Sequence, residues 1–78
     1  MYKNITDVDI QNFYLKIGSN IASLRKNRGL SQLQLSHILG HNSTTIVSLG
    51  ELGKKHFSVK HLLIISSYFE VDIAELFK

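Results

Sequence analysis

The stretch that decides the fold is GLSQLQLSHILGHNSTTIVSLGELG, residues 29–53. Apolar residues recur in it at helical spacing on both sides of Gly40, which indicates two short helices joined by a turn. Ser31 can cap the first helix, and Ser43 or Thr44 can cap the second. Gly40 permits the left-handed backbone that such a turn requires. The stretch therefore predicts a helix-turn-helix motif.

Capping residues and apolar periodicity outside this stretch predict three more helices. Thr6, Ser58 and Asp72 each precede an apolar run, and Asp9 and Glu75 stand in capping-box positions three residues after Thr6 and Asp72. No residue pattern alternates over a length that would favour a β-sheet. We therefore expect an all-α domain over residues 7–78, preceded by an arm over residues 1–6. The five expected helices span about 7–26, 32–39, 45–52, 59–69 and 73–77.

Two small residues are expected at points where helices cross closely. Gly18 interrupts the first helix at a cost of about 1 kcal/mol relative to alanine. Close approach of a neighbouring helix would explain why a glycine occurs there. Ser36 is expected at the crossing within the motif, where the second helix packs over the first.

Basic residues are concentrated in the middle of the chain. Residues 16–60 carry seven Lys or Arg and one Glu, a net charge of +6, whereas the whole chain has a formal net charge of +3. A basic surface suits contact with phosphate, although a solvated mixed surface is the simpler interpretation of charge alone. The chain has no cysteine and no apolar run of about 20 residues, so we expect no disulfide and no membrane span, and a cytoplasmic location.

From Ile17 to Phe77, the sequence resembles the Cro/repressor (XRE) family of lambda-repressor-like helix-turn-helix domains. The matching elements are Ile17-Gly18, Ile21, Leu24-Arg25, Gly29-Leu30-Ser31-Gln32, Leu35, Leu39-Gly40, Glu51, Gly53-Lys54, Leu62-Leu63, Ile65 and Val71-Asp72-Ile73-Ala74-Glu75-Leu76-Phe77. They cover roughly three quarters of the chain. The resemblance implies a compact five-helix domain whose third helix enters the major groove of double-stranded DNA.

The sequence departs from the family pattern by one additional residue between Gly40 and Glu51. If the turn is longer, Val47 and Gly50 point inward. If the additional residue falls near Gly50, Ile46 and Leu49 point inward instead. The register decides which side chains can meet the bases.

The resemblance also implies a set of DNA-binding residues. Gln32 would contact phosphate or an adjacent base, Lys54 and Lys55 would contact the backbone beyond the recognition helix, and the remaining residues would face the bases: Asn42, Ser43, Thr44, Thr45 and Ser48. The alternatives are that Gln32 assists the cap, that the hydroxyl residues only begin a helix, and that the lysines lie in a solvated loop. Arg25, Lys26 and Arg28 are expected to serve the C-terminus of the first helix rather than DNA.

Catalytic and metal-binding readings have little support in the sequence. The four histidines are His37, His41, His56 and His61, and cysteine is absent. His37 and His41 are four residues apart, but Gly40 ends the helix between them and no further ligand has the spacing of a zinc site. Capping explains the C-terminal acids, and no nucleophile stands in a recognisable setting. We therefore expect no enzyme activity, no metal and no cofactor.

Ile64 and Tyr68 lie off the apolar stripe by which the fourth helix would face the core. They are expected to form a homodimer interface, which Phe77 could join, or to pack under the N-terminal arm against Tyr2, Ile5 or Val8. A dimer would read two half-sites on DNA. Two hypotheses follow: a dimeric regulator that represses by occluding its operator, or a protein-interaction module, such as an antitoxin or phage-type accessory protein, whose DNA binding is secondary.

Overall fold

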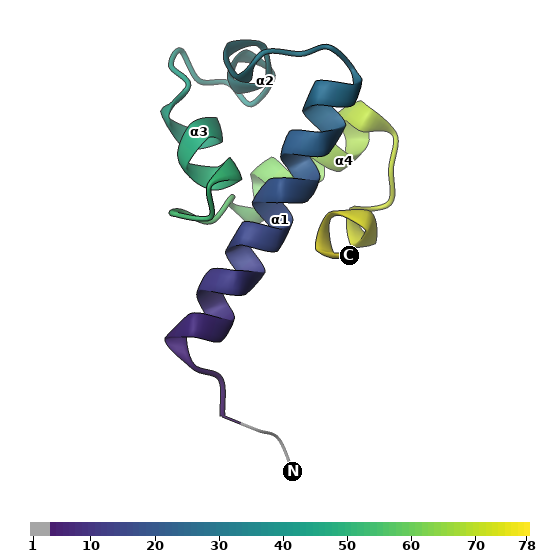
Figure 1. The fold of residues 1–78 in the computed structure, drawn as a ribbon. Coiled ribbons are helices and arrows are strands. Elements are labelled where there is room, and N and C mark those ends of the chain that lie inside the picture. Colours follow the sequence, from purple (N-terminus) through teal and green to yellow (C-terminus); the bar gives the residue numbers. More distant parts are fainter. Residues whose placement is uncertain (1–3) are drawn as a thin grey trace.

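The computed structural model describes residues 4–78, and residues 1–3 of the expected arm lie outside the described part (Figure 1). Within residues 4–78, four α-helices and a 3₁₀-helix follow one another. Their bounds are α1 Asp7–Asn27, α2 Gln32–Ile38, α3 Thr45–Glu51, α4 Val59–Phe69 and η1 Ile73–Phe77. The all-helical prediction is confirmed, except that the expected fifth α-helix is a 3₁₀-helix.

Side-chain caps begin most of these helices where the sequence predicts them. Thr6 and Asp9 form the expected capping box of α1, and Ser58 accepts a hydrogen bond from the backbone nitrogen of His61 at the start of α4. Ser31 caps α2 and also forms a capping box, with the side chain of Gln34. The predicted capping box of the last helix is wrong, because its Glu75 carboxylate accepts a hydrogen bond from Lys78 instead.

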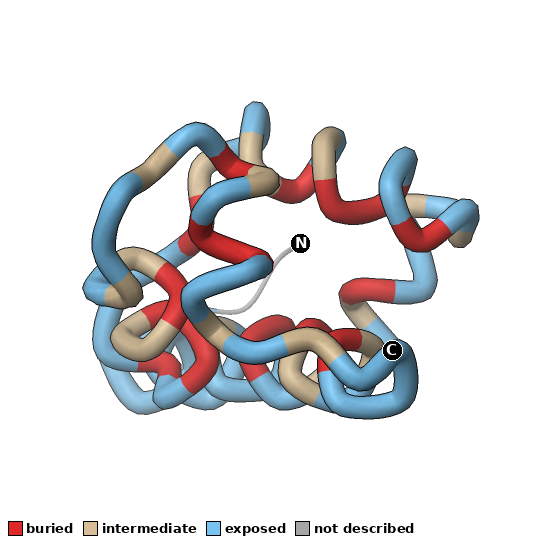
Figure 2. Tube along the Cα trace, turned by 90° about the horizontal axis from the view of Figure 1, so that it is seen from above, coloured by how far each residue is buried: buried red, intermediate tan, exposed pale blue. Residues whose placement is uncertain are grey.

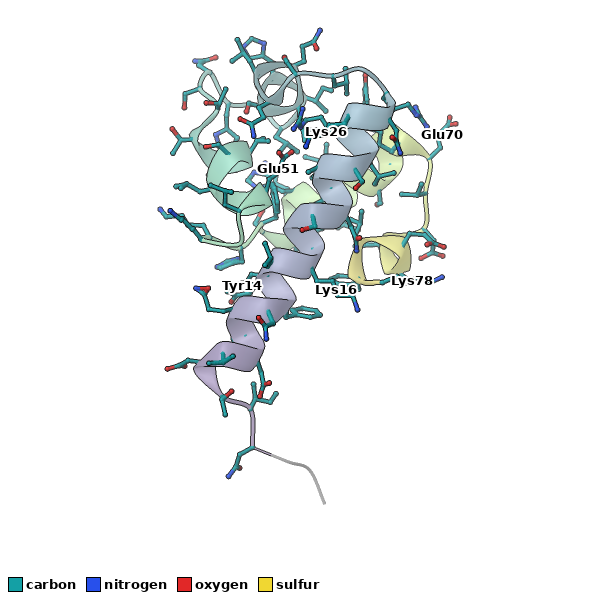
Figure 3. All side chains as sticks on the ribbon, viewed as in Figure 1. Tyr14, Lys16, Lys26, Glu51, Glu70 and Lys78 are labelled. Atoms are coloured by element: carbon teal, nitrogen blue, oxygen red, sulfur yellow. The ribbon has the colours of Figure 1, made fainter. Side chains whose placement is uncertain are left out.

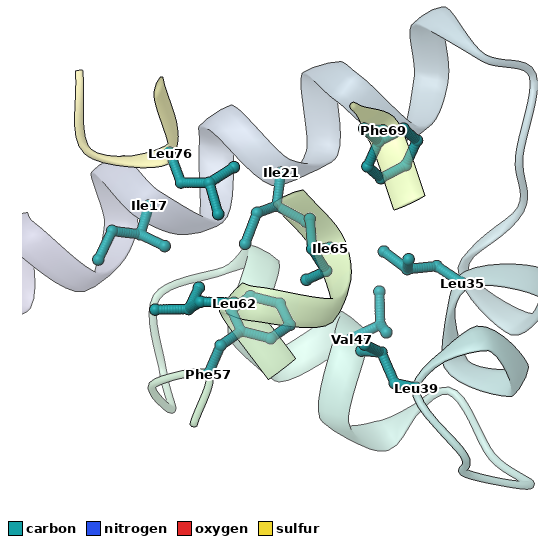
Figure 4. Close-up of a cluster of buried hydrophobic side chains, with 10 residues drawn as sticks. All are labelled: Ile17, Ile21, Leu35, Leu39, Val47, Phe57, Leu62, Ile65, Phe69 and Leu76. Atoms are coloured by element: carbon teal, nitrogen blue, oxygen red, sulfur yellow. The ribbon is translucent and has the colours of Figure 1, made fainter. Parts of the chain in front are cut away.

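One hydrophobic core joins all five elements (Figures 2 and 4). α1 and α4 lie across each other, and the two short helices of the motif and η1 close the remaining sides. Side chains with 0 or 1% exposure include members from every element, so the position of α3 is fixed by the whole domain. The core consists of Ile17, Ile21, Leu35, Leu39, Val47, Phe57, Leu62, Ile65, Phe69 and Leu76.

α1 and α3 cross at two glycines. A Cβ atom on Gly18 would lie 2.2 Å from the carbonyl oxygen of Gly50 and 2.8 Å from that of Glu51. A Cβ atom on Gly50 would lie 2.5 Å from the ring of Phe57. The predicted close approach at Gly18 is therefore confirmed, and the neighbouring helix is α3, the second helix of the helix-turn-helix motif.

The first turns of α1 extend beyond the rest of the domain (Figure 1). Every residue from Asn4 to Phe13 is exposed, whereas Ile17 and Ile21 further along the same helix are buried. No helix among the described residues, α1 included, is both long and apolar enough to cross a membrane.

Candidate nucleic-acid interface

The register of α3 is the first of the two alternatives, with the additional residue in the turn. Val47 is fully buried and Gly50 packs on Phe57, so these two positions face the core. Thr45 and Ser48 consequently lie on the outer side of the helix, where Thr45 is exposed and Ser48 is half-buried. The outer side of α3 is therefore lined by short hydroxyl side chains that can donate or accept hydrogen bonds at base edges.

The turn before α3 contributes two more exposed polar residues, Asn42 and Ser43. Gly40 has a φ of +86°, and the next backbone nitrogen, that of His41, donates to the carbonyl oxygen of Ser36. The Ser43 hydroxyl donates to Thr45 Oγ1 at 3.3 Å. Thr44 occupies the N-cap position but forms no side-chain capping bond, so its half-buried hydroxyl is not used to begin the helix.

Gln32 is linked to the recognition helix through the buried carboxylate of Glu51. Gln32 Nε2 donates to Glu51 Oε1 at 3.0 Å, and Arg25 donates from Nε to Oε2 at 2.7 Å and from Nη2 to Oε1 at 3.0 Å. The side-chain hydrogen bond to Glu51 raises the pKa of Arg25 above its ordinary value, and burial opposes this only in part. The guanidinium therefore stays charged. Figure 3 shows Glu51 between α3 and α1. The network fixes the amide of Gln32 at the edge of the groove that Ser48 also lines.

Arg25 and Lys26 lie in the last turn of α1 as expected, but two arginines there also bind other elements. Arg25 does not serve the end of its own helix as an exposed cation, because it is buried, bonds Glu51 and donates from Nη1 to the carbonyl oxygen of Leu30. Arg28 donates to the carbonyl oxygen of Phe69 at the end of α4 and lies 5.5 Å over the ring of that residue. The signal that could have revealed the ion pair is that Glu51 is the single acid in a strongly basic stretch.

Lys54 and Lys55 are exposed in the loop that follows α3. Both backbone nitrogens donate to the carbonyl oxygen of Leu49, which holds this loop against the end of the recognition helix. Neither ammonium group forms an ion pair within residues 4–78. Two cations next to the hydroxyl face of α3 can contact the phosphates on one side of a groove.

Two histidines meet beside the turn of the motif. His41 Nε2 and His61 Nε2 lie 3.2 Å apart, and His61 Nδ1 is buried without a hydrogen-bond partner. Burial lowers the pKa of His61, and the neighbouring His41 and Lys60 lower it further. No group of three or more possible metal ligands occurs among the described residues.

The apolar residues expected at a dimer interface lie on two separate surfaces. Ile64 and Tyr68 adjoin Ile38 of α2 in a shallow apolar groove, and Tyr68 is 47% exposed. Phe77 instead stacks on Phe13 of α1, with ring centroids 5.8 Å apart. Ile5 and Val8 are themselves exposed, so they do not cover Ile64 and Tyr68, and Tyr2 lies outside the described residues.

Comparisons with known proteins agree with this geometry. The helix-turn-helix family model HTH_3 matches residues 21–76, more than two thirds of the chain. The crystal structure of the restriction-modification controller protein C.AhdI from Aeromonas hydrophila is similar, with a TM-score of 0.72 and 28% sequence identity over 82% of this chain and 96% of that one. No curated protein matches the chain in sequence. The chain belongs to the XRE-type helix-turn-helix family of DNA-binding transcription regulators.

Proposed function

We propose that this regulator binds a specific operator as a homodimer, with α3 in the major groove, and represses transcription by occluding the site. The observation that carries the proposal is the outer side of α3, where Thr45 and Ser48 face away from a core that holds the helix rigidly. The likeness to a restriction-modification controller protein favours a regulatory task. We further propose that the protein acts in the cytoplasm and needs neither catalytic activity nor a cofactor.

Each predicted DNA-binding residue has a role in this proposal. The short hydroxyl and amide side chains of the turn and of α3 contact base edges, and a threonine methyl group can also meet the methyl group of thymine. Gln32, Lys54 and Lys55 contact phosphates and so set the position of α3 in the groove. The base-contacting residues are Asn42, Ser43, Thr44, Thr45 and Ser48. Because these side chains are short, they discriminate weakly between bases, and DNA shape contributes a large part of the specificity.

The proposed dimer pairs the apolar groove of α4 with the same groove of a second copy. Ile64 and Tyr68 are the central side chains of this surface, and burying them would remove apolar area from water. A two-fold dimer would present two copies of α3 to half-sites about 34 Å apart. Phe77, which lies elsewhere, would contribute only if the interface extended around η1.

The test is binding to duplex DNA across a salt series. Lys54→Glu should weaken binding to every sequence and reduce the slope of log affinity against log salt by about 1, because one phosphate contact is lost. Lys78→Glu is the control with the same change in net charge, since Lys78 lies beside η1 and away from α3 (Figure 3). Equal effects of the two substitutions would mean that the loop after α3 does not contact DNA.

The exposed apolar groove of α4 also favours a second candidate function, a protein-interaction module whose DNA binding is secondary. Ile64→Asp and the pair Lys54→Glu with Lys55→Glu separate the two candidates. A regulator loses its activity when the lysines are reversed. An interaction module loses it with Ile64→Asp while DNA binding persists.

A further inference from the structure

The apolar side of α1 that faces the core continues into the first turns of the helix, which lie outside the core. Ile10 and Tyr14 each stand seven residues, about two helical turns, before Ile17 and Ile21 respectively, so they lie on the same side of α1. Ile10 is nevertheless exposed, because nothing in the domain packs over it. Ile10 is 41% exposed and Phe13 is 48% exposed. We name this surface the projecting stripe, which consists of Ile5, Ile10, Phe13 and Tyr14; together with Asp9 these residues line one apolar hollow. The family match begins at residue 21, so the stripe lies outside the matched residues.

An apolar groove continues the projecting stripe toward the domain. Phe13 stacks on Phe77, and Tyr14 lies 5.5 Å from the ring of His56, which leaves a groove of about 250 Å³ next to the exposed Val59. Its walls come from α1, from the loop before α4, from the start of α4 and from η1. A contiguous apolar surface of this kind on a small protein marks a contact with another macromolecule.

The charges beside the stripe indicate which macromolecule. Asp9 and Lys16 are seven residues apart, close to two helical turns, so they lie along the same flank of α1 with Phe13 between them. Asp9 Oδ2 accepts hydrogen bonds from the backbone nitrogen and the hydroxyl of Thr6, and these bonds lower the pKa of the Asp9 carboxyl. Its other oxygen, Oδ1, accepts no hydrogen bond among the described residues. Lys16 forms no ion pair within the described residues. The flank therefore carries one unpaired charge of each sign.

We propose that the projecting stripe binds the stripe of a second copy of this chain, with the two α1 helices antiparallel. In that arrangement the same flank of each α1 meets that of the other copy, and the two chains run in opposite directions. Asp9 of each copy therefore meets Lys16 of the partner subunit. The first turn of each helix then points toward the groove beside Val59 and Phe77 of the other copy. A parallel pair would bring the acidic first turns together, with Asp7 and Asp9 side by side, and is disfavoured.

This contact is separate from the proposed DNA-binding face and from the groove of α4. The stripe lies at the end of the molecule that points away from α2 and α3 (Figure 1). Its few side chains expose less than the roughly 800 Å² per partner of a standard interface, so association is expected at micromolar concentrations. If the groove of α4 also pairs copies, the two surfaces together join dimers into larger assemblies.

The experiment is the mass of the full chain in solution, without DNA, between about 1 and 100 μM. Ile10→Asp should halve the mass of the largest species, because a charge in the stripe breaks the contact between the two copies. The core stays intact, because Ile10 is exposed. Val8→Asp is the matched control: Val8 is 66% exposed on the other side of α1, and its replacement should leave the mass unchanged. The proposal is overturned if the wild type and Ile10→Asp have the same mass at every concentration.

Charge reversal tests the antiparallel arrangement. Lys16→Glu should weaken self-association about tenfold, because two attractive pairs per contact become repulsive. Mixing Lys16→Glu with Asp9→Lys should restore association, since every pair then joins opposite charges. Mixing Asp9→Lys with the wild type restores only one of the two pairs and controls for the lost capping box. Equal association in both mixtures would exclude the antiparallel contact.

Discussion

Replacing Gly18 with alanine tests the crossing that sets the position of the recognition helix. Alanine is the better helix former by about 1 kcal/mol, so α1 by itself would gain stability. In the folded protein the new Cβ would lie 2.2 Å from the carbonyl oxygen of Gly50 and 2.9 Å from the carbonyl carbon of Glu51, both backbone atoms of α3. The helices would have to separate by about 1 Å, and overpacking of this kind costs about 3 kcal/mol. The expected net loss is about 2 kcal/mol.

The assay is thermal and urea unfolding followed by circular dichroism. For a domain of this size, a net loss of 2 kcal/mol lowers Tm by roughly 8–16 °C. Ser19→Ala is the control, because Ser19 is exposed on the same helix and should gain a few tenths of a kcal/mol from helix propensity alone. An unchanged or raised Tm for Gly18→Ala would refute the close crossing and, with it, the assigned register of α3.

Two further predictions concern buried polar groups. Glu51→Gln should lower the free energy of unfolding by about 3 kcal/mol, because the buried guanidinium of Arg25 loses its carboxylate partner. The double change Arg25→Met with Glu51→Met should recover much of that loss. A double variant less stable than Glu51→Gln in urea unfolding would contradict this. Burial and neighbouring positive charge hold the pKa of His61 below its ordinary value of 6.5, so the unfolded chain takes up a proton that the folded protein resists. Stability should be level above pH 6.5 and decrease as the pH falls from 6.5 toward 5, and His61→Gln should flatten that slope in urea titrations.

Local signals were sufficient to predict most of the fold. Thr6, Ser31 and Ser58 cap helices where they were expected, because a side-chain cap depends on residues only three positions apart. The last helix was less predictable: Glu75 can reach either the backbone or Lys78, and only the folded geometry of the short C-terminal turn decides between them.

The interface was less predictable because it depends on contacts between distant residues. The sequence left two registers for α3, and the choice depends on Gly50 meeting the ring of Phe57 and the backbone beside Gly18. The link from Arg25 through Glu51 to Gln32 joins three elements, so no local spacing reveals it. The sequence predicts that Phe77 can join Ile64 and Tyr68 on one surface, but the turn after α4 places it against Phe13.

Selection from a random-sequence duplex library, followed by sequencing of the bound fragments, tests most directly that the outer side of α3 reads DNA. The wild type should enrich an inverted repeat with half-sites about one helical turn apart. Ser48→Ala should change the base preference at one position in each half-site and leave the other positions intact. Absence of an enriched sequence, or the same sequence enriched equally by both proteins, would contradict the account.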